Sequence, residues 1–208
     1  MTKRRYDMVK RIVDIVTSAV GIVATAPLQA LTALVVLMNF GRPVLFRQDR
    51  PGKDGRIFRL TKFRTMREPT ASLVTDEQRL TRCGRLLRST SLDELPTLWN
   101  VLKGDMSLVG PRPLLEKYLS RYTPEQARRH EVRPGITGLA QTRGRNALPW
   151  ETKLRLDVEY VERRSMSLDL CILLATVATV TRRQGIGNGP LPTMVEFHGT
   201  HPGDPRDA

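Results

Sequence analysis

The sequence predicts a mostly helical α+β protein in which a re-entrant membrane helix-break-helix precedes a small globular domain. The first observation behind this class is an uncharged run from 15 to 41 that a proline divides. The second is a pair of short strand-forming runs, between 44 and 60, joined by a turn-rich segment. The third is a series of helical patterns from 75 to 180. Together they predict a membrane hairpin, a short β-hairpin and interfacial amphipathic helices.

Residues 15–41 contain no Asp, Glu, Lys, Arg or His, and Pro27 lies almost at their centre. About 20 apolar residues suffice to cross a bilayer, so this run is long enough to enter one. Proline lacks a backbone N–H and clashes with the preceding turn, so we expect the helix to bend or break at Ala26 and Pro27, as a helix-break-helix. Each arm would be roughly 18–20 Å long, which is too short to cross alone. Basic residues flank both ends, and this favours a return to the side of entry.

Three other interpretations of this run stay open at the level of sequence. Proline is tolerated in transmembrane helices, so the run could be a kinked but complete span. The basic start and the A-x-A-like sequence Ala24-Thr25-Ala26 suggest a signal peptide, although the apolar run continues well past that site. A buried helix pair in a soluble core is the third interpretation, and the run is long and uniform for it.

The composition indicates an anionic partner. The chain has 208 residues and a formal net charge of +13, which suits nucleic acid, anionic lipid or a phosphorylated substrate. Aromatic residues make up only 5%, which disfavours the stacking platforms of single-strand binders. Cys83 and Cys171 show no C-x-x-C spacing and suit two reduced thiols in a cytosolic compartment. We expect the hairpin at 1–41, a cytoplasmic domain at 42–184 and an irregular tail at 185–208.

The remaining elements follow from local patterns. Val44 to Phe46 and Ile57 to Leu60 read as strands around a turn-rich connection. Thr75 to Leu87 reads as a helix that its first residue caps. Trp150 to Arg163 predicts a charged amphipathic helix, and Leu168 to Val180 an apolar helix suited to the core or to the bilayer surface.

Two adjacent carboxylates stand at the start of a further predicted helix. Ser91 and Glu94 satisfy the S-x-x-E capping box, and an apolar face follows, made of Leu95, Leu98, Trp99 and Leu102. Taken alone, Asp93 and Glu94 are first-turn residues that complement the helix dipole. Their setting is strongly cationic, however, and the rigid 110–113 turn (GPRP) lies close in sequence. A carboxylate pair can hold a divalent cation and offer a nucleophile to phosphorus.

A glycine-punctuated loop at 133–141 (RPGITGLAQ) offers a weaker phosphate signal. Its glycines would let backbone N–H groups approach a phosphate, but the P-loop spacing is missing. Gln141 at its end is a candidate substrate- or phosphate-binding residue.

Taken together, these segments resemble the bacterial sugar transferase family, the small monotopic phosphoglycosyl transferases. The resemblance runs over nearly the whole chain. The length of the chain resembles that of the minimal members of the family. The ordered motifs that carry it are KRIVD at 10–14, the proline-containing hairpin, QDRPGKDGRIFRLTKFRTM at 48–66, SLDELPTLWNVLKGDMSLVGPRP at 91–113, RPGITGLAQTRGRN at 133–146 and LDL at 168–170.

The resemblance implies an enzyme of the bacterial inner membrane, monotopic at the cytoplasmic face. It would move a sugar 1-phosphate from a UDP-sugar to polyprenol (undecaprenyl) phosphate and release UMP, in the first membrane step of glycoconjugate assembly. The family resemblance assigns the covalent nucleophile to Asp93 and the Mg²⁺ ligand to Glu94. Family basic positions at the active site correspond to Lys62, Arg64, Arg88, Arg112 and Arg145. Membrane lipid is an implied partner, and nucleic acid is not.

Two details modify this expectation. Many members have Ser before the hairpin proline, whereas this chain has Ala26, so the bend must rely on Pro27, Thr25, Gln29 or packing. The tail at 192–199 is similar to tails of members that use N-acetylated, bacillosamine-type sugars. A homodimer is compatible with the sequence, although no residue pattern requires one. The rival hypotheses are a membrane-tethered nucleic acid binder and a scaffold for glycan assembly, which would tolerate loss of both carboxylates.

Overall fold

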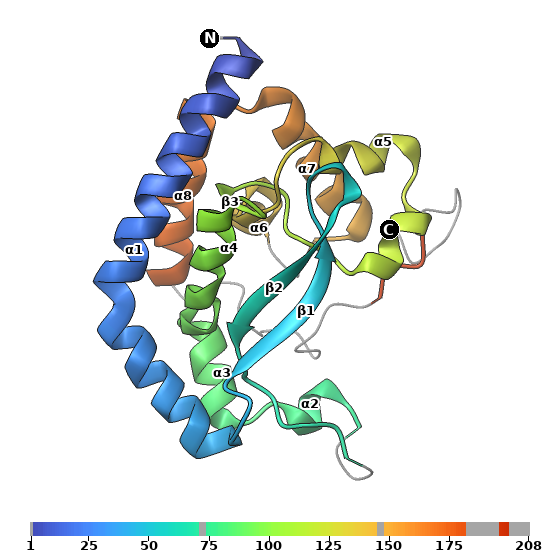
Figure 1. Ribbon diagram of the computed structural model, residues 1–208. Coiled ribbons are helices and arrows are strands. Elements are labelled where there is room, and N and C mark those ends of the chain that lie inside the picture. Colours follow the sequence, from blue (N-terminus) through green and yellow to red (C-terminus); the bar gives the residue numbers. More distant parts are fainter. Residues whose placement is uncertain (1, 71–73, 145–147, 182–195, 200–208) are drawn as a thin grey trace.

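One long helix, α1 (Lys3–Phe40), forms one side of the computed structural model, which describes residues 2–70, 74–144, 148–181 and 196–199 (Figure 1). The chain stays helical through Ala26 and Pro27, so of the two outcomes expected there, a bend or a break, the helix shows the bend (Figure 1). Side chains support this turn, because Thr25 donates to the Gly21 carbonyl at 2.6 Å and Gln29 donates to the Thr25 hydroxyl at 2.9 Å. These bonds lie beside the position where Pro27 has no N–H to donate.

α1 rests on the rest of the molecule along one narrow stripe. Its buried residues are Tyr6, Asp14, Ser18, Thr32 and Val36. Only 11% of its most apolar 18-residue window is buried, and that window is apolar and long enough to cross a membrane. Both ends of the helix are held: Arg11 Nη1 donates to the Val101 carbonyl at 2.7 Å, and the Phe40 carbonyl accepts from Arg64.

The predicted β-hairpin is present and longer than expected. Strands β1 (Leu45–Pro51) and β2 (Ile57–Phe63) pair antiparallel, and the short 3₁₀ turn η1 (Lys53–Gly55) connects them. The register places Leu45 opposite Phe63 at the open end. Phe63 is buried there against α1 and the segment after residue 86, which fixes the hairpin to the long helix.

The helix expected from Thr75 to Leu87 is two helices instead. Thr75 caps α2 (Asp76–Arg79), as predicted, and Thr81 caps α3 (Arg82–Ser89). Between them Leu80 leaves the helix and pairs with Met66 in an antiparallel bridge. α3 then approaches the end of β2 closely, because a Cβ at Gly84 would lie 2.0 Å from the Thr65 carbonyl oxygen.

The next segment builds the centre of the molecule. The 3₁₀-helix η2 (Leu92–Thr97) leads into α4 (Leu98–Lys103), which packs against α1. A second, parallel sheet then forms between β3 (Ser107–Val109) and β4 (Gly135–Thr137). The sequence did not predict this pair, since its strands are short and far apart in the chain.

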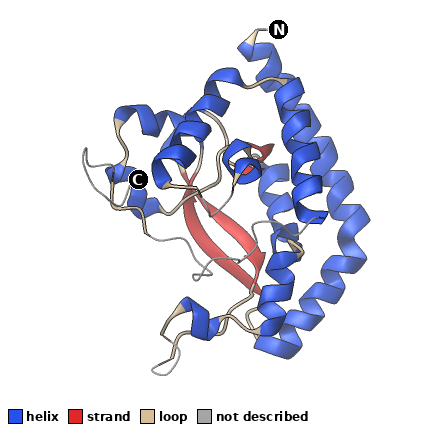
Figure 2. Cartoon of the chain, turned by 180° about the vertical axis from the view of Figure 1, so that it is seen from behind, coloured by secondary structure: helices blue, strands red, loops and turns tan. Residues whose placement is uncertain are grey.

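The remaining helices cover the side away from α1 and then return to it (Figures 1 and 2). They are η3 (Glu116–Arg121), α5 (Pro124–Ala127), η4 (Arg128–Glu131), α6 (Leu139–Arg143), α7 (Trp150–Arg163) and α8 (Met166–Thr181). α7 has the bounds expected from its amphipathic pattern. α8 meets the start of α1, where the Asp169 carboxylate accepts hydrogen bonds from Tyr6 and Lys10.

A short part of the expected tail lies within the described residues. At 196–199 the chain packs against η3 and α7, and Phe197 is buried between Tyr118 and Trp150. Arg121 donates to the Phe197 carbonyl and pairs with Glu196 at 2.9 Å. The rest of the tail, including Pro192 to Val195 of the segment similar to bacillosamine-type members, lies outside the described residues.

Candidate functional site

The turn into η2 places the adjacent carboxylates. Ser91 has φ 57° and ψ 17°, a left-handed conformation that is uncommon for a residue with a side chain. Its side chain caps nothing, so the predicted capping box is wrong: the Glu94 N–H bonds instead to the Ser91 carbonyl at 3.1 Å. The following residues form a 3₁₀-helix with Pro96 inside it, rather than the expected first turn of an α-helix. Backbone strain of this kind is concentrated at functional sites.

Asn100 of α4 ties this segment to the hairpin. Its side chain accepts from the Thr61 N–H at 3.1 Å and donates to the Arg59 carbonyl at 2.8 Å. Thr97 adds a hydrogen bond to the Thr61 carbonyl at 3.1 Å. These bonds align β2 with η2, and Lys62 of β2 therefore lies over Glu94. Sequence reasoning missed Asn100, whose one signal is a polar residue inside the apolar run LWNVL.

Two cationic side chains, one from β2 and one from the 110–113 turn, contact the Glu94 carboxylate. Lys62 Nζ lies 2.5 Å from Glu94 Oε1, and Arg112 Nη2 lies 3.1 Å from the same oxygen. The side chains of Lys62 and Glu94 are 18% and 20% exposed, so solvent screens this ion pair only in part. Burial alone would raise the pKa of Glu94, but Lys62 and then Arg112 outweigh it and lower that pKa to about 2. Glu94 is therefore an anion at any physiological pH.

Asp93 is in a different state, although it is the next residue. It is 8% exposed, and no hydrogen bond reaches its carboxylate from the part of the chain that the structure describes. Burial, followed by the charge of Glu94, raises the pKa of Asp93 to about 6, against the opposing effect of Lys62, Arg88 and Arg112. The carboxylate is thus mostly ionised at neutral pH, but it is desolvated and unbound, which favours reactivity as a nucleophile.

The structure brings three of the six predicted binding residues to the carboxylate pair. Lys62 and Arg112 contact Glu94, and Arg88 lies near enough to act on Asp93 by its charge while its Nε donates to the Thr65 hydroxyl at 3.0 Å. These three cations therefore surround the carboxylate pair.

The other predicted residues lie elsewhere. Arg64 donates to the Phe40 and Gly41 carbonyls and pairs with Glu68 at 2.9 Å, so it fixes the end of α1. Within the described part of the chain, no hydrogen bond or ion pair joins it to the carboxylate pair. Both polar atoms of the Gln141 side chain are buried, and neither has a hydrogen-bond partner among the described residues. Arg145 lies outside the described residues.

The glycines of the 133–141 loop serve backbone packing. A Cβ at Gly135 would lie 2.1 Å from the Gly110 nitrogen, and one at Gly138 would lie 2.2 Å from the Gly110 carbonyl oxygen. The Gly135 N–H itself donates to the Pro111 carbonyl at 2.9 Å. This glycine thus joins the loop to the 110–113 turn and has no free N–H for a phosphate.

The carboxylate pair suits a Mg²⁺ ion that takes most of its ligands from phosphate oxygens and water. The described residues contain no group of three or more His, Cys, Asp or Glu side chains that could form a complete protein site. Both cations contact Oε1 of Glu94, and no hydrogen bond from the described residues reaches Oε2. One or two carboxylates, completed by phosphate oxygens and water, are the usual Mg²⁺ set at phosphate-transfer sites.

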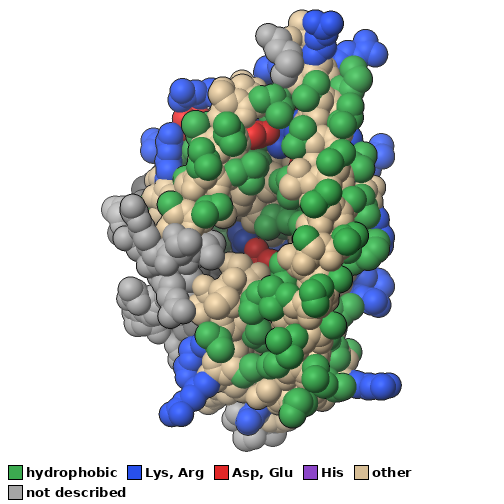
Figure 3. All heavy atoms as spheres, turned by 90° about the vertical axis from the view of Figure 1, so that its left-hand side faces the viewer, with side chains coloured by type: hydrophobic (Ala, Val, Ile, Leu, Met, Phe, Trp, Pro, Cys, Tyr) green, Lys and Arg blue, Asp and Glu red, His purple; other side chains and the backbone are tan. Residues whose placement is uncertain are grey.

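An apolar surface lies at the edge of the molecule that α1 and α8 share. Figure 3 shows hydrophobic side chains over both helices and a hollow between them with basic and acidic side chains at its bottom. On α8 the exposed residues include Leu170, Leu174 and Val177, each at least 57% exposed. On α1 they include Val16, Val20, Val23, Leu31 and Met38. An apolar patch this extended is typical of a membrane or protein interface.

Several known proteins are similar to this chain over most of its length. The model of the family described as bacterial sugar transferase matches residues 5–183. The uncharacterized sugar transferase EpsL of Bacillus subtilis is 50% identical over 93% of this chain and 97% of its own length. The UDP-glucose:undecaprenyl-phosphate glucose-1-phosphate transferase of Caulobacter vibrioides is 42% identical over 84% of this chain and 70% of its own length.

Some of the relatives are much longer than this chain. The UDP-N-acetylgalactosamine-undecaprenyl-phosphate N-acetylgalactosaminephosphotransferase of Aeromonas hydrophila is 38% identical over 84% of this chain. The match covers 44% of that protein, so this chain spans less than half of its length.

Proposed function

Because the chain belongs to the bacterial sugar transferase family, we propose that it transfers a sugar 1-phosphate from a UDP-sugar to undecaprenyl phosphate and releases UMP. Relatives with names that state both substrates support this reaction. The single observation that carries it is the unbound Asp93 carboxylate beside Glu94, which Lys62 and Arg112 hold. Phosphoryl transfer requires mainly positioning and neutralisation of charge, and this cluster offers both.

In the first half-reaction, an Asp93 oxygen attacks the phosphorus that carries the sugar. An oxygen–phosphorus bond forms to Asp93, and the bond from that phosphorus to the bridging oxygen breaks. UMP leaves with the bridging oxygen and its electron pair. The cations Lys62, Arg88 and Arg112 offset the charge of the diphosphate, which otherwise repels the approaching carboxylate.

In the second half-reaction, an oxygen of undecaprenyl phosphate attacks the same phosphorus and frees the Asp93 carboxylate. The product is a sugar joined to the polyprenol by a diphosphate. The covalent step means that the soluble donor and the lipid acceptor need not occupy the site together. Asp93 needs no general base, because it is already largely ionised at neutral pH.

Glu94 would hold Mg²⁺, and the adjacent residue Asp93 would remain available as the nucleophile. When bound, the ion would supply positive charge to the diphosphate oxygens. The ion pairs of Glu94 with Lys62 and Arg112 keep its carboxylate charged and fixed, which a hard divalent cation requires.

The apolar edge formed by α1 and α8 would enter the cytoplasmic leaflet of the inner membrane. Two features of α1 support a monotopic placement. Its first turns bond to α4 and α8, and its last turn bonds to Arg64 after β2, so both ends lie against the same body. In a complete span, one of those ends would lie beyond about 30 Å of hydrocarbon, away from the polar body that holds both.

The decisive experiment is incubation of the full chain in detergent or nanodiscs with candidate UDP-sugars, undecaprenyl phosphate and Mg²⁺. We expect UMP and a polyprenol-linked sugar diphosphate in equal amounts. UMP without lipid product would instead indicate a hydrolase. Salt-sensitive binding of DNA or RNA without UMP release would favour the nucleic acid binder.

Membrane placement has its own test. Single cysteines at the exposed positions Arg5 and Arg47, in a chain without Cys83 and Cys171, should both react with an impermeant thiol reagent from one side of a sealed vesicle. Reaction from opposite sides would establish a complete span and contradict the monotopic placement.

A further inference from the structure

The turn that carries Arg112 is held at three successive carbonyl groups. Arg112 stands between Pro111 and Pro113, which have no backbone N–H and cannot anchor the turn as donors. The carbonyls of these three residues each accept a hydrogen bond from a different element. In chain order the donors are Gly135 N at 2.9 Å, Arg129 Nη2 at 2.7 Å and Arg50 Nη1 at 3.3 Å.

Arg129 provides the central bond and is itself buried. Its side chain is 2% exposed, and that of its partner Asp157 on α7 is 5% exposed. Arg129 Nε and Nη2 donate to Asp157 Oδ2 at 3.0 Å and 2.7 Å, and Nη2 also donates to the Arg112 carbonyl at 2.7 Å. The guanidinium therefore joins a carboxylate of α7 to the backbone of Arg112.

Fold stability does not account well for this pair. Replacing a buried ion pair by apolar residues of similar volume is often neutral or stabilising, because the pair does not fully recover its desolvation cost. The part that apolar residues cannot replace is the donor to the Arg112 carbonyl. The side chain of Arg112 is 46% exposed beyond that point, so little besides its backbone fixes the 3.1 Å contact with Glu94.

We propose that Arg129, oriented by Asp157, is a positioning residue for Arg112 and through it for Glu94. This inference rests on the proposed function, because it concerns the same site. Its physical basis is that a shift of about 1 Å at a positioning group can cost about 100-fold in rate. Without the Arg129 bond, the middle carbonyl of the turn has no donor, and Arg112 can move away from Glu94.

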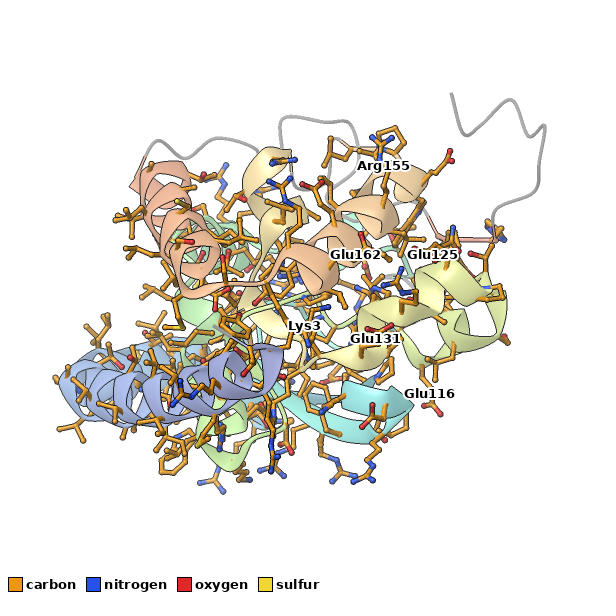
Figure 4. All side chains as sticks on the ribbon, turned by 90° about the horizontal axis from the view of Figure 1, so that it is seen from above. Lys3, Glu116, Glu125, Glu131, Arg155 and Glu162 are labelled. Atoms are coloured by element: carbon orange, nitrogen blue, oxygen red, sulfur yellow. The ribbon has the colours of Figure 1, made fainter. Side chains whose placement is uncertain are left out.

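Three variants separate positioning from structural support. Arg129→Met with Asp157→Leu removes the donor but keeps an apolar, filled core. Asp157→Asn keeps the donor while it weakens the buried pair. Arg128→Met is the matched control: Arg128 is the preceding residue, and its ion pairs are with Glu125, Glu131 and Glu162, which lie together at the surface (Figure 4). UMP release and the melting temperature are measured for each.

We expect the double variant to be the slower enzyme and Asp157→Asn to be the less stable protein. The double variant should melt near the wild type yet release UMP about 10- to 100-fold more slowly. Asp157→Asn should melt lower yet keep most of the rate, and Arg128→Met should match the wild type in rate. In an Arg112→Met background, the double replacement should have little further effect on rate. If the double variant does not fold, Arg129→Lys takes its place, and it should lose more rate than Asp157→Asn.

A double variant as active as Arg128→Met, or rates that follow the melting temperatures, would overturn the inference. Wild-type protein that releases no UMP with any UDP-sugar would instead overturn the proposed function.

Discussion

Asp93 and Asp169 are buried to nearly the same degree, at 8% and 5% exposure, but their surroundings differ. The Asp169 carboxylate accepts hydrogen bonds from Tyr6 at 2.8 Å, Lys10 at 2.6 Å and Tyr160 at 2.8 Å. Asp93 accepts none from the described part of the chain, and its pKa is set by burial and then by the charges around it. A buried carboxylate with all its donors present connects structural elements, whereas one without them remains available for chemistry.

The two carboxylates also have different roles, one structural and one proposed to be catalytic. Asp169 joins α8 to the start of α1 and so attaches the apolar edge to the core. Asp93 lies within the cation cluster that we propose as the active site. The comparison predicts that Asp93 controls the rate without stabilising the fold, and that Asp169 stabilises the fold without controlling the rate.

The largest expected effect is that of Asp93→Asn on turnover. We expect UMP release to fall at least about 1000-fold, since the amide cannot form the covalent intermediate. A radiolabelled sugar phosphate should no longer be trapped on the protein. The free energy of unfolding should not fall, because no hydrogen bond is lost. It should rise at neutral pH, since the amide removes a buried charge whose desolvation raises the pKa of Asp93 to about 6. A variant that keeps most of its activity would show that the covalent assignment is wrong.

Asp169→Ala should show the opposite pattern. It leaves Tyr6, Tyr160 and Lys10 without their shared acceptor in a buried place, which we expect to destabilise the fold by about 3 kcal/mol. The rate per folded molecule should stay within about threefold of the wild type. Chemical unfolding in detergent, paired with UMP release at low temperature, measures both. A folded variant that has lost its activity would contradict the purely structural role of Asp169.

Local sequence patterns predicted the elements that depend on local contacts. α7 follows its amphipathic pattern from Trp150 to Arg163, and the β-hairpin forms around its turn. Patterns failed where a distant residue decides the structure. Leu80 ends α2 because it pairs with Met66, and the β3–β4 pair needs Gly135 to approach Gly110. The turn at Pro27 depends on side-chain hydrogen bonds that periodicity does not reveal.

The candidate site was predictable to a different degree. From the residues alone, Asp93 and Glu94 were either first-turn residues that complement the helix dipole or a carboxylate pair able to hold a cation and attack phosphorus. The family resemblance assigned their individual roles and supplied the cations around them. The structure brings Lys62 and Arg112 to Glu94 but places Arg64 at the end of α1. Their basic character is the same, so only the three-dimensional arrangement separates them.

Glu94→Gln tests whether the second carboxylate of the site holds Mg²⁺. The amide oxygen can still accept from Lys62 and Arg112, but it has no charge to attract a cation. We expect the rate to fall about 10- to 100-fold and the Mg²⁺ concentration for half-maximal rate to rise. The control is Glu68→Gln, which also loses an ion pair with an arginine, Arg64, and should leave both quantities unchanged. Equal effects of the two variants would contradict a role for Glu94 in holding Mg²⁺.

His130 tests whether every buried group that lacks a partner is catalytic. Its Nδ1 lies 3.1 Å from the Gly52 carbonyl oxygen, and its Nε2 is buried without a partner among the described residues. Burial, and then the charge of Arg129, lower its pKa from 6.5 to about 4. Below pH 6.5 the unfolded chain therefore binds a proton that the folded chain does not, so stability falls as the pH drops from 6.5 toward 4.

We expect His130→Asn to remove part of this acid sensitivity. Between pH 7.5 and 5.0 the wild type should lose at most about 2 kcal/mol of unfolding free energy through this group, and the variant should lose correspondingly less. The rate of UMP release at pH 7.5 should not change, because the ring stays neutral and makes no contact with the carboxylate pair. The exposed His198, replaced by Asn, is the control and should leave the pH dependence of unfolding as it is. If His130→Asn instead lowered the rate at pH 7.5, then lack of a partner would mark function at His130 as it does at Asp93.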